Sequence, residues 1–279
     1  MRVVLGTGAA VLAVAMAGQA AAAELAFDDV VARVVVIPEA RADIQVEVTP
    51  GRNGAPTVRV SRSGDTVTVT SGSRVKQCNF DGENGSWIRL KGGDRIDMDD
   101  AASVTVRAPR DVRISGGGAI QGSIGRSQTL TIEQSGCANW TAGDVAGALN
   151  ADMSTGASLR AGSTPSAHLT AVAGGSVRVV RADRLEASAT AGGVVKAMTA
   201  PGMVTATATG GGVVSIDGGS TRSLAGTATG GAHIRHKGRV GELNVNAAGG
   251  AVIRVAHATR VLSSSSHGGS SVVINDRDD

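Results

Sequence analysis

Aromatic residues are almost missing from this chain. Its 279 residues include two phenylalanines, two tryptophans and no tyrosine, and no aromatic residue follows Trp140. A globular core of ordinary composition would use many more large rings. Disorder does not explain the shortage, because disordered chains combine low hydrophobicity with high charge, whereas 42% of these residues are hydrophobic and 18% are charged. The sequence therefore predicts a core that is built repeatedly from small side chains.

Long hydrophobic runs are missing beyond the N-terminus. The first segment has a positive start at Met1-Arg2, a short apolar stretch over residues 3–17 and small residues at 21–23. This order is typical of a secretory signal peptide, and the apolar stretch is too short for a comfortable membrane span. No later segment is apolar enough to cross a bilayer. We therefore expect a signal peptide over residues 1–23 and an exported chain, either periplasmic or at the cell surface or outside the cell.

A dominant charge of one sign is also lacking. Without Arg2, 26 lysines and arginines stand against 24 aspartates and glutamates. This balance disfavours a dedicated nucleic-acid binder, because such proteins gain affinity from many phosphate contacts. The stretch GGGAIQG at 116–122 is not followed by a helical pattern, so it is not a nucleotide-binding loop. We expect no nucleic-acid partner and no cofactor.

Cysteine occurs only at Cys78 and Cys137. In an exported chain two cysteines can form one disulfide, and the alternative is two separate buried thiols. Two cysteines without paired histidines nearby make a poor zinc site. His233 and His236 would lie on opposite faces of a strand, and His257 from a neighbouring repeat adds only a weak case for a metal site. The acidic stretch at 94–100 lacks the pattern of a calcium loop, so we expect no metal.

Glycine, in contrast, is abundant, with 40 residues, and it marks a repeat. Small-residue marks, usually Gly-Gly, recur with spacings of 20, 20, 18, 18, 19, 19, 19 and 19 residues. The marks begin at Gly116, Gly136, Gly156, Gly174, Gly192, Gly211, Gly230, Gly249 and Gly268. Regular periods of this length are typical of solenoids. In the stretch at 204–219 the mark falls within a run of three glycines at 210–212. We predict that the register of the repeat changes at this run.

Each repeat has the same internal order. A short alternating stretch runs into the glycine pair, a Val/Ile-rich alternating stretch follows, and a polar turn closes the unit. Alternation at period two indicates strands, and glycine permits the bend between them. The pattern predicts an all-β parallel solenoid of about nine rungs of 18–20 residues, each rung being one turn of the chain. The alternative is an antiparallel β-sandwich, which also has short strands at regular spacing.

The N-terminal region is less regular. Alternating stretches at 31–37, 44–50, 57–62 and 66–71 are separated by Pro, Gly and Asn-rich joints, which predict strands and turns. We expect a strand-rich cap over residues 24–102 that protects the first edge of the solenoid, and solenoid repeats over residues 103–279. Residues 78–93 are predicted to be a loop or an insertion.

These residues resemble a known family. The stretches VVIPEARADIQVEV, TVRVSRSGDTVTV and SVTVRAPRDVRISGGG, followed by Gly-Gly strand units, are similar to the bacterial adhesin-like proteins with a head GIN domain. The resemblance covers about residues 30 to 275. It implies a right-handed parallel β-solenoid at the cell envelope. It implies no established activity and no catalytic residues.

The repeats predict a column of cations on one face of the solenoid. When the rungs are aligned on the strand after the glycine pair, one outward position is mostly basic. It reads Trp140, Arg160, Arg178, Lys196, Ser215, Arg235 and Arg254. Stacked cations repel one another, so an anionic ligand would relieve them. The alternative is that the column binds no ligand, and that its side chains splay apart and keep a Gly/Ala surface soluble. Asp183, Glu186 and Asp217 would then neutralise part of its charge.

The function that follows is a non-catalytic binding or structural module. Its expected partners are anionic envelope glycans, contacted through the five cations Arg160, Arg178, Lys196, Arg235 and Arg254, or an envelope protein. The alternative is a polysaccharide lyase or hydrolase on the same scaffold. Such enzymes need clustered carboxylates and usually aromatic sugar platforms, and the repeats after Trp140 have no aromatic residue.

Overall fold

A computed structural model of the protein describes residues 23–80, 85–93 and 95–277. The expected signal peptide lies outside these residues except for Ala23, so it stays a prediction. Every regular element in the described ranges is a β-strand. Within the same ranges, no helix is long and apolar enough to cross a membrane.

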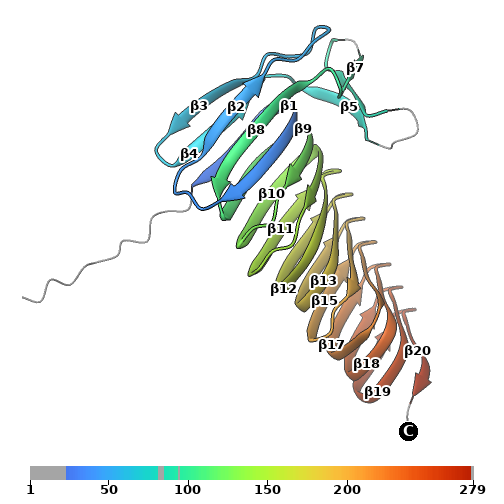
Figure 1. Ribbon diagram of the computed structural model, residues 1–279. Helices are drawn as coiled ribbons and strands as arrows, with labels where there is room; N and C mark the ends of the chain where they lie inside the picture. The colour runs from blue at the N-terminus through green and yellow to red at the C-terminus, as the bar shows by residue number, and fades with distance from the viewer. Residues whose placement is uncertain (1–22, 81–84, 94, 278–279) are drawn as a thin grey trace, which may run out of the picture.

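The repeats form a parallel β-solenoid, as the glycine marks predict (Figure 1). Nine rungs follow one another, and the strands of successive rungs pair in parallel. The strands are β9 Asp111–Ile124, β10 Thr129–Ala142, β11 Ala148–Ser154, β12 Ser158–Val172, β13 Ser176–Thr190, β14 Val194–Thr199, β15 Met203–Thr209, β16 Val213–Gly218, β17 Ser220–Thr229, β18 His233–Ala248, β19 Val252–His267 and β20 Ser271–Arg277. The alternative β-sandwich is therefore wrong.

Each rung folds over a sharp glycine corner into two sheets. We call the sheet made of the segments before each corner the leading sheet, and the sheet made of the segments after it the trailing sheet. From the corner between β11 and β12 onward, each corner holds two consecutive residues with positive φ, for example Ala173 at 49° and Gly174 at 83°. The next residue packs against the rung before it. A Cβ on Gly193 would lie 2.0 Å from the carbonyl oxygen of Ala171, so only glycine fits there.

The glycine triplet at 210–212 does not change the register, and that prediction is wrong. The amide of Gly210 donates to the carbonyl oxygen of Thr229 at 3.1 Å, and pairing continues on both sides of the corner. Rung length changes instead at the opposite bend. Arg181 and Leu185, four residues apart (185 − 181), pair with Thr199 and Val204, five residues apart (204 − 199). Extra residues enter where the polar bend has room for them.

The N-terminal strands continue the stack before they close it. β1 (Glu24–Glu39) pairs in parallel with β9 on one side and with β4 (Thr66–Thr70) and β8 (Ala102–Pro109) on the other. β2 (Gln45–Thr49) and β3 (Arg59–Ser63) then add antiparallel to β8 and β4. The predicted division between residues 102 and 103 falls at the start of β8. Antiparallel strands at this end cover what would otherwise be an open parallel edge.

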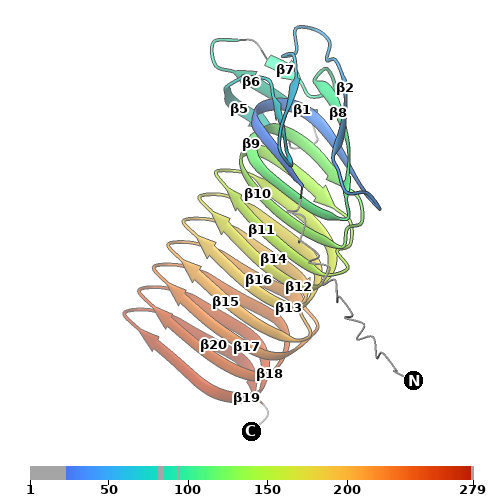
Figure 2. The same ribbon diagram turned by 90° about the vertical axis from the view of Figure 1, so that its left-hand side faces the viewer.

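A small antiparallel sheet projects beside the first rungs (Figures 1 and 2). It consists of β5 (Val75–Asn79), β6 (Trp87–Leu90) and β7 (Arg95–Asp97). The sequence predicts a loop or an insertion over residues 78–93, and the described residues of this range show an insertion that carries strands, while residues 81–84 lie outside the described ranges. Its buried Ile88 and Ile96 cluster with Val31 and Ala119 on the solenoid, so hydrophobic burial fixes the sheet against the stack.

The core is mostly alanine, valine, leucine and isoleucine, with aromatic rings only near its N-terminal end in the described residues. Trp140 and Phe27 are both buried, with ring centroids 5.8 Å apart. The indole Nε1 of Trp140 donates to Oε1 of Gln134 at 3.2 Å. Gly122 on the neighbouring rung leaves the space that the indole fills. Because Phe27 lies on β1 and Trp140 on β10, with β9 between these strands, the two rings meet across the level of β9, where Gly122 leaves room.

Candidate functional site

The five predicted cations lie in one column on the trailing sheet. Arg160 is in register with Arg178, and Arg178 is in register with Lys196. Ser215 follows Lys196, and Arg235 and Arg254 follow Ser215. The four arginines are exposed, and Lys196 is half-buried. Because paired strands lie about 4.8 Å apart, the column is a line of closely spaced positive charge with one hydroxyl gap.

Trp140 does not belong to this column, and its predicted outward position is wrong. Thr141 is in register with Arg160, whereas Trp140 pairs with Leu159 and points into the core. Side chains alternate along a strand, so a shift of one residue exchanges the two faces. The column therefore begins at Arg160 and is preceded by the uncharged Thr141.

None of the five cations forms an ion pair with a carboxylate in the part of the chain that the structure describes. Two of the acids expected to neutralise the column are paired elsewhere. Asp183 contacts Arg181 at 2.8 Å, and Glu186 contacts His168 at 3.2 Å.

Asp217 is the acid that lies near the column. Its carboxylate contacts Nζ of Lys237 at 2.7 Å. The hydrogen bond from Lys237 is the main cause that lowers the pKa of Asp217, and Lys196 lowers it further through its charge. Asp217 therefore stays ionised and offsets part of the positive charge at Lys196. The charges of Arg160, Arg235 and Arg254 are not offset by this carboxylate.

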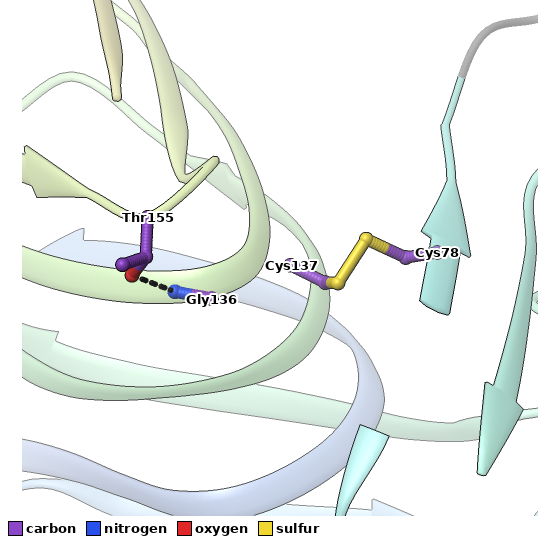
Figure 3. Close-up of a disulfide and its surroundings, with 4 residues drawn as sticks. All are labelled: Cys78, Gly136, Cys137 and Thr155. Carbon is purple, nitrogen blue, oxygen red and sulfur yellow. Dashed lines mark hydrogen bonds between the residues drawn. A yellow bond between two sulfur atoms is a disulfide. The ribbon is translucent and has the colours of Figure 1, made fainter. Parts of the chain in front are cut away.

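The disulfide between Cys78 and Cys137 is present and joins the small sheet to the solenoid (Figure 3). Cys137 follows Gly136 at a corner of the second rung, and Cys78 lies on β5. The amide of Gly136 donates to Oγ1 of Thr155 on the next rung at 3.1 Å. A disulfide of this kind fits an oxidising compartment, in agreement with export.

A groove of about 480 Å³ lies between the small sheet and the start of the basic column. Its residues are Gln77, Cys78, Asn79, Phe80, Trp87, Ala138, Asn139, Gly156, Ser158, Leu159, Arg160, Ser176 and Arg178. Two further hollows adjoin it. One, of about 730 Å³, shares Phe80 and Arg160 with the groove, and another, of about 350 Å³, shares Arg160 and Arg178 and continues to Lys196. Arg160 is common to all three hollows.

Sequence reasoning missed the aromatic side of this groove. Phe80 and Trp87 precede the first cation of the column, Arg160, by 80 and 73 residues (160 − 80 and 160 − 87), and yet they line the same groove as Arg160 and Arg178. The available signal was the cysteine pair, because a Cys78–Cys137 bond places Cys78 and the strand that carries it beside the second rung. Trp87 also holds Arg95 against its ring, with the guanidinium carbon 5.0 Å from the ring centroid.

The histidines do not converge. His236 is buried, its Nε2 lies 2.7 Å from Oγ1 of Thr221, and its Nδ1 accepts from the amide of Gly238 at 3.1 Å. Burial lowers the pKa of His236. His233 is exposed on the other face of the strand. Among the described residues, no group of three or more His, Cys, Asp or Glu side chains is arranged to hold a metal ion.

Comparison with known proteins does not assign this chain to a family. No family model matches the chain, and no curated protein matches it. Similar solved structures include a "putative lipid binding protein" from Parabacteroides distasonis ATCC 8503, with a TM-score of 0.48, 12% identity and coverage of 92% of this chain and 93% of that one. A "putative adhesin" from Parabacteroides merdae ATCC 43184 has the same TM-score and identity, with 92% of each chain covered.

Proposed function

We propose that the protein is an exported, non-catalytic binding module of the cell envelope that contacts anionic glycans through its basic column. The observation that carries this proposal is the register of five cations on one face, none of them paired with a carboxylate in the described residues. A flexible polyanion laid along the column would meet several of these charges at once. Such multiple contacts raise both affinity and association rate.

The non-catalytic part of the proposal rests on the carboxylates near the column. A glycoside hydrolase uses two carboxyl groups that flank the scissile bond. In the three hollows the acids are Asp99 and Asp217, which line different hollows. Each already contacts a base, Asp99 with Arg33 at 3.6 Å and Asp217 with Lys237 at 2.7 Å. This arrangement offers a binding surface rather than an acid–base pair.

The test uses residues 24–279 and a variant in which Arg178, Arg235 and Arg254 are all changed to alanine. Binding to polygalacturonate and to lipopolysaccharide is measured at low and moderate salt. We expect the wild type to bind one of these polyanions in a salt-dependent way and the variant to lose most of that affinity. Equal binding by the two proteins, or no binding by the wild type, would contradict the proposal.

The same samples separate a binding module from an enzyme. Each polysaccharide is incubated with the wild-type protein and assayed for unsaturated products and for new reducing ends. We expect neither to accumulate above the level of a heat-denatured control. If products form with the native protein but not with the heat-denatured control, the protein is a polysaccharide lyase or hydrolase and the non-catalytic proposal is wrong.

A further inference from the structure

The groove beside the disulfide combines two kinds of wall. The small sheet contributes the half-buried rings of Phe80 and Trp87, and the trailing sheet contributes the guanidinium groups of Arg160 and Arg178. The polar residues Asn139, Ser158 and Ser176 also line the groove. Small-molecule sites have this pattern, with apolar and aromatic lining and a few polar groups that fix orientation.

The cations in the groove are available to a ligand. Arg160 and Arg178 have no carboxylate partner in the described part of the chain, whereas Arg33 in the adjoining hollow contacts Asp99. The Nε of Arg33 is buried, and within the described residues it has no hydrogen-bond partner. Guanidinium groups bind carboxylates through two parallel hydrogen bonds, so this end of the column suits a carboxylate better than a neutral group.

The groove is held in shape before any ligand enters. The disulfide fixes β5 to the second rung, and the buried Ile88 fixes β6. Arg95 packs on the Trp87 ring, and the hydroxyl of Ser158 donates to Oδ1 of Asn139 at 3.1 Å. A site whose side chains are already ordered loses less entropy on binding.

We infer that this groove binds one acidic pyranose unit of a polyuronate. The sugar ring packs against Trp87 and Phe80, its carboxylate is held by Arg160 and Arg178, and its hydroxyl groups face Asn139. The inference rests on the proposed function, since the rest of the anionic chain follows the column toward Arg254. Beyond the proposed function, we infer that the ligand is bound most strongly at the Arg160 end of the column, where aromatic rings and guanidinium groups line the same groove. The volume of about 480 Å³ is in the range of small-ligand sites.

The test measures binding of trigalacturonate to residues 24–279 and to single variants. We expect Arg160→Gln and Trp87→Ala each to weaken binding by about tenfold or more, because each removes a contact to the same sugar unit. Trp87→Phe keeps a ring and should stay within about threefold of the wild type. Arg222→Gln removes an equal charge at an exposed position off the column and should also change binding by less than about threefold at moderate salt.

Three controls make the result specific. Trigalactose, which has the rings without the carboxylates, should bind at least about tenfold more weakly, and inorganic phosphate should not displace trigalacturonate at equal concentration. Arg160→Gln lies on the solenoid, so it tests the site even if Trp87→Ala disturbs the small sheet. Ligand-induced change in tryptophan fluorescence should vanish in Trp87→Phe, since the remaining Trp140 is buried.

Several outcomes would overturn the inference. They are absence of trigalacturonate binding, equal loss in Arg222→Gln and Arg160→Gln, full displacement by phosphate, or wild-type affinity in both Arg160→Gln and Trp87→Ala. If polygalacturonate still binds and the column triple variant still loses it, only the groove is wrong. If the wild type binds no polyanion at all, the proposed function fails as well.

Discussion

Cys78 and Cys137 are joined by a disulfide that fastens an inserted antiparallel sheet to a glycine corner of the solenoid, with their Cα atoms 6.1 Å apart. The bond spans 59 residues of sequence, from β5 to the second rung. It is therefore the covalent support of the groove that Phe80 and Trp87 share with the basic column.

Removing this disulfide should destabilise the protein. For Cys78→Ser with Cys137→Ser we expect the free energy of unfolding to fall by about 2–4 kcal/mol, because the bond restricts the unfolded chain over a long loop. Urea unfolding of the double variant and the wild type measures the difference. Labelling of either cysteine by a thiol reagent in the unreduced, denatured wild type would show that the bond does not form.

Gly122 should not tolerate a side chain. A Cβ at this position would lie 2.1 Å from the indole of Trp140, and overpacking a core of this kind costs about 1–3 kcal/mol. Gly218→Ala is the matched control, since a Cβ there meets nothing within 4 Å. Thermal unfolding should show a clear loss for Gly122→Ala and little change for Gly218→Ala. Equal melting temperatures would mean that the indole is not packed over Gly122.

Stability should fall below neutral pH because of His236. Its Nδ1 accepts a hydrogen bond from the amide of Gly238, so protonation would place two donors against each other. Burial holds the pKa of His236 below its ordinary value, while the unfolded state keeps a pKa near 6.5. Above that pH both states are neutral and the group adds no pH dependence. As the pH falls below about 6.5, the unfolded state takes up protons first, and the free energy of unfolding decreases.

The measurement for this residue is urea unfolding from pH 8 to pH 5. The difference between the wild type and His236→Gln isolates the histidine from the carboxylates, which titrate at lower pH. We expect the wild type to lose stability more steeply than His236→Gln between pH 7 and pH 5. His233→Gln, at an exposed position, should follow the wild type. Parallel curves for the wild type and His236→Gln would contradict the prediction.

The solenoid and the basic column could be predicted from the sequence because both depend on a local geometry that recurs in every repeat. Each corner needs left-handed residues, so glycine marks appear at the rung spacing, and in-register stacking then brings Arg178 and Arg254 onto one face. Trp140 was assigned to the wrong face because alternation has period two, so a one-residue error in alignment exchanges inside and outside.

The groove could not be predicted in the same way. The position of Trp87 depends on where the small sheet packs, and that is decided by tertiary contacts of Ile88 and by the Cys78–Cys137 bond. These contacts belong to no repeat, and a strand pattern at 87–90 does not show what the strands lie against. The changes of rung length at the bend opposite the glycines could not be predicted from the sequence for a related reason. A polar bend accepts an extra residue without altering the glycine corners, so the glycine pattern does not show where the residue is added.

An arginine footprint tests most directly whether the basic column binds a polyanion. Residues 24–279 are treated with phenylglyoxal with and without polygalacturonate, and modification of each arginine is followed by mass spectrometry. We expect the polyanion to protect Arg160, Arg178, Arg235 and Arg254. Arg184 and Arg222, which are exposed off the column, should react at unchanged rates. Equal protection of all exposed arginines, or protection of none of the four in the column, would contradict this prediction.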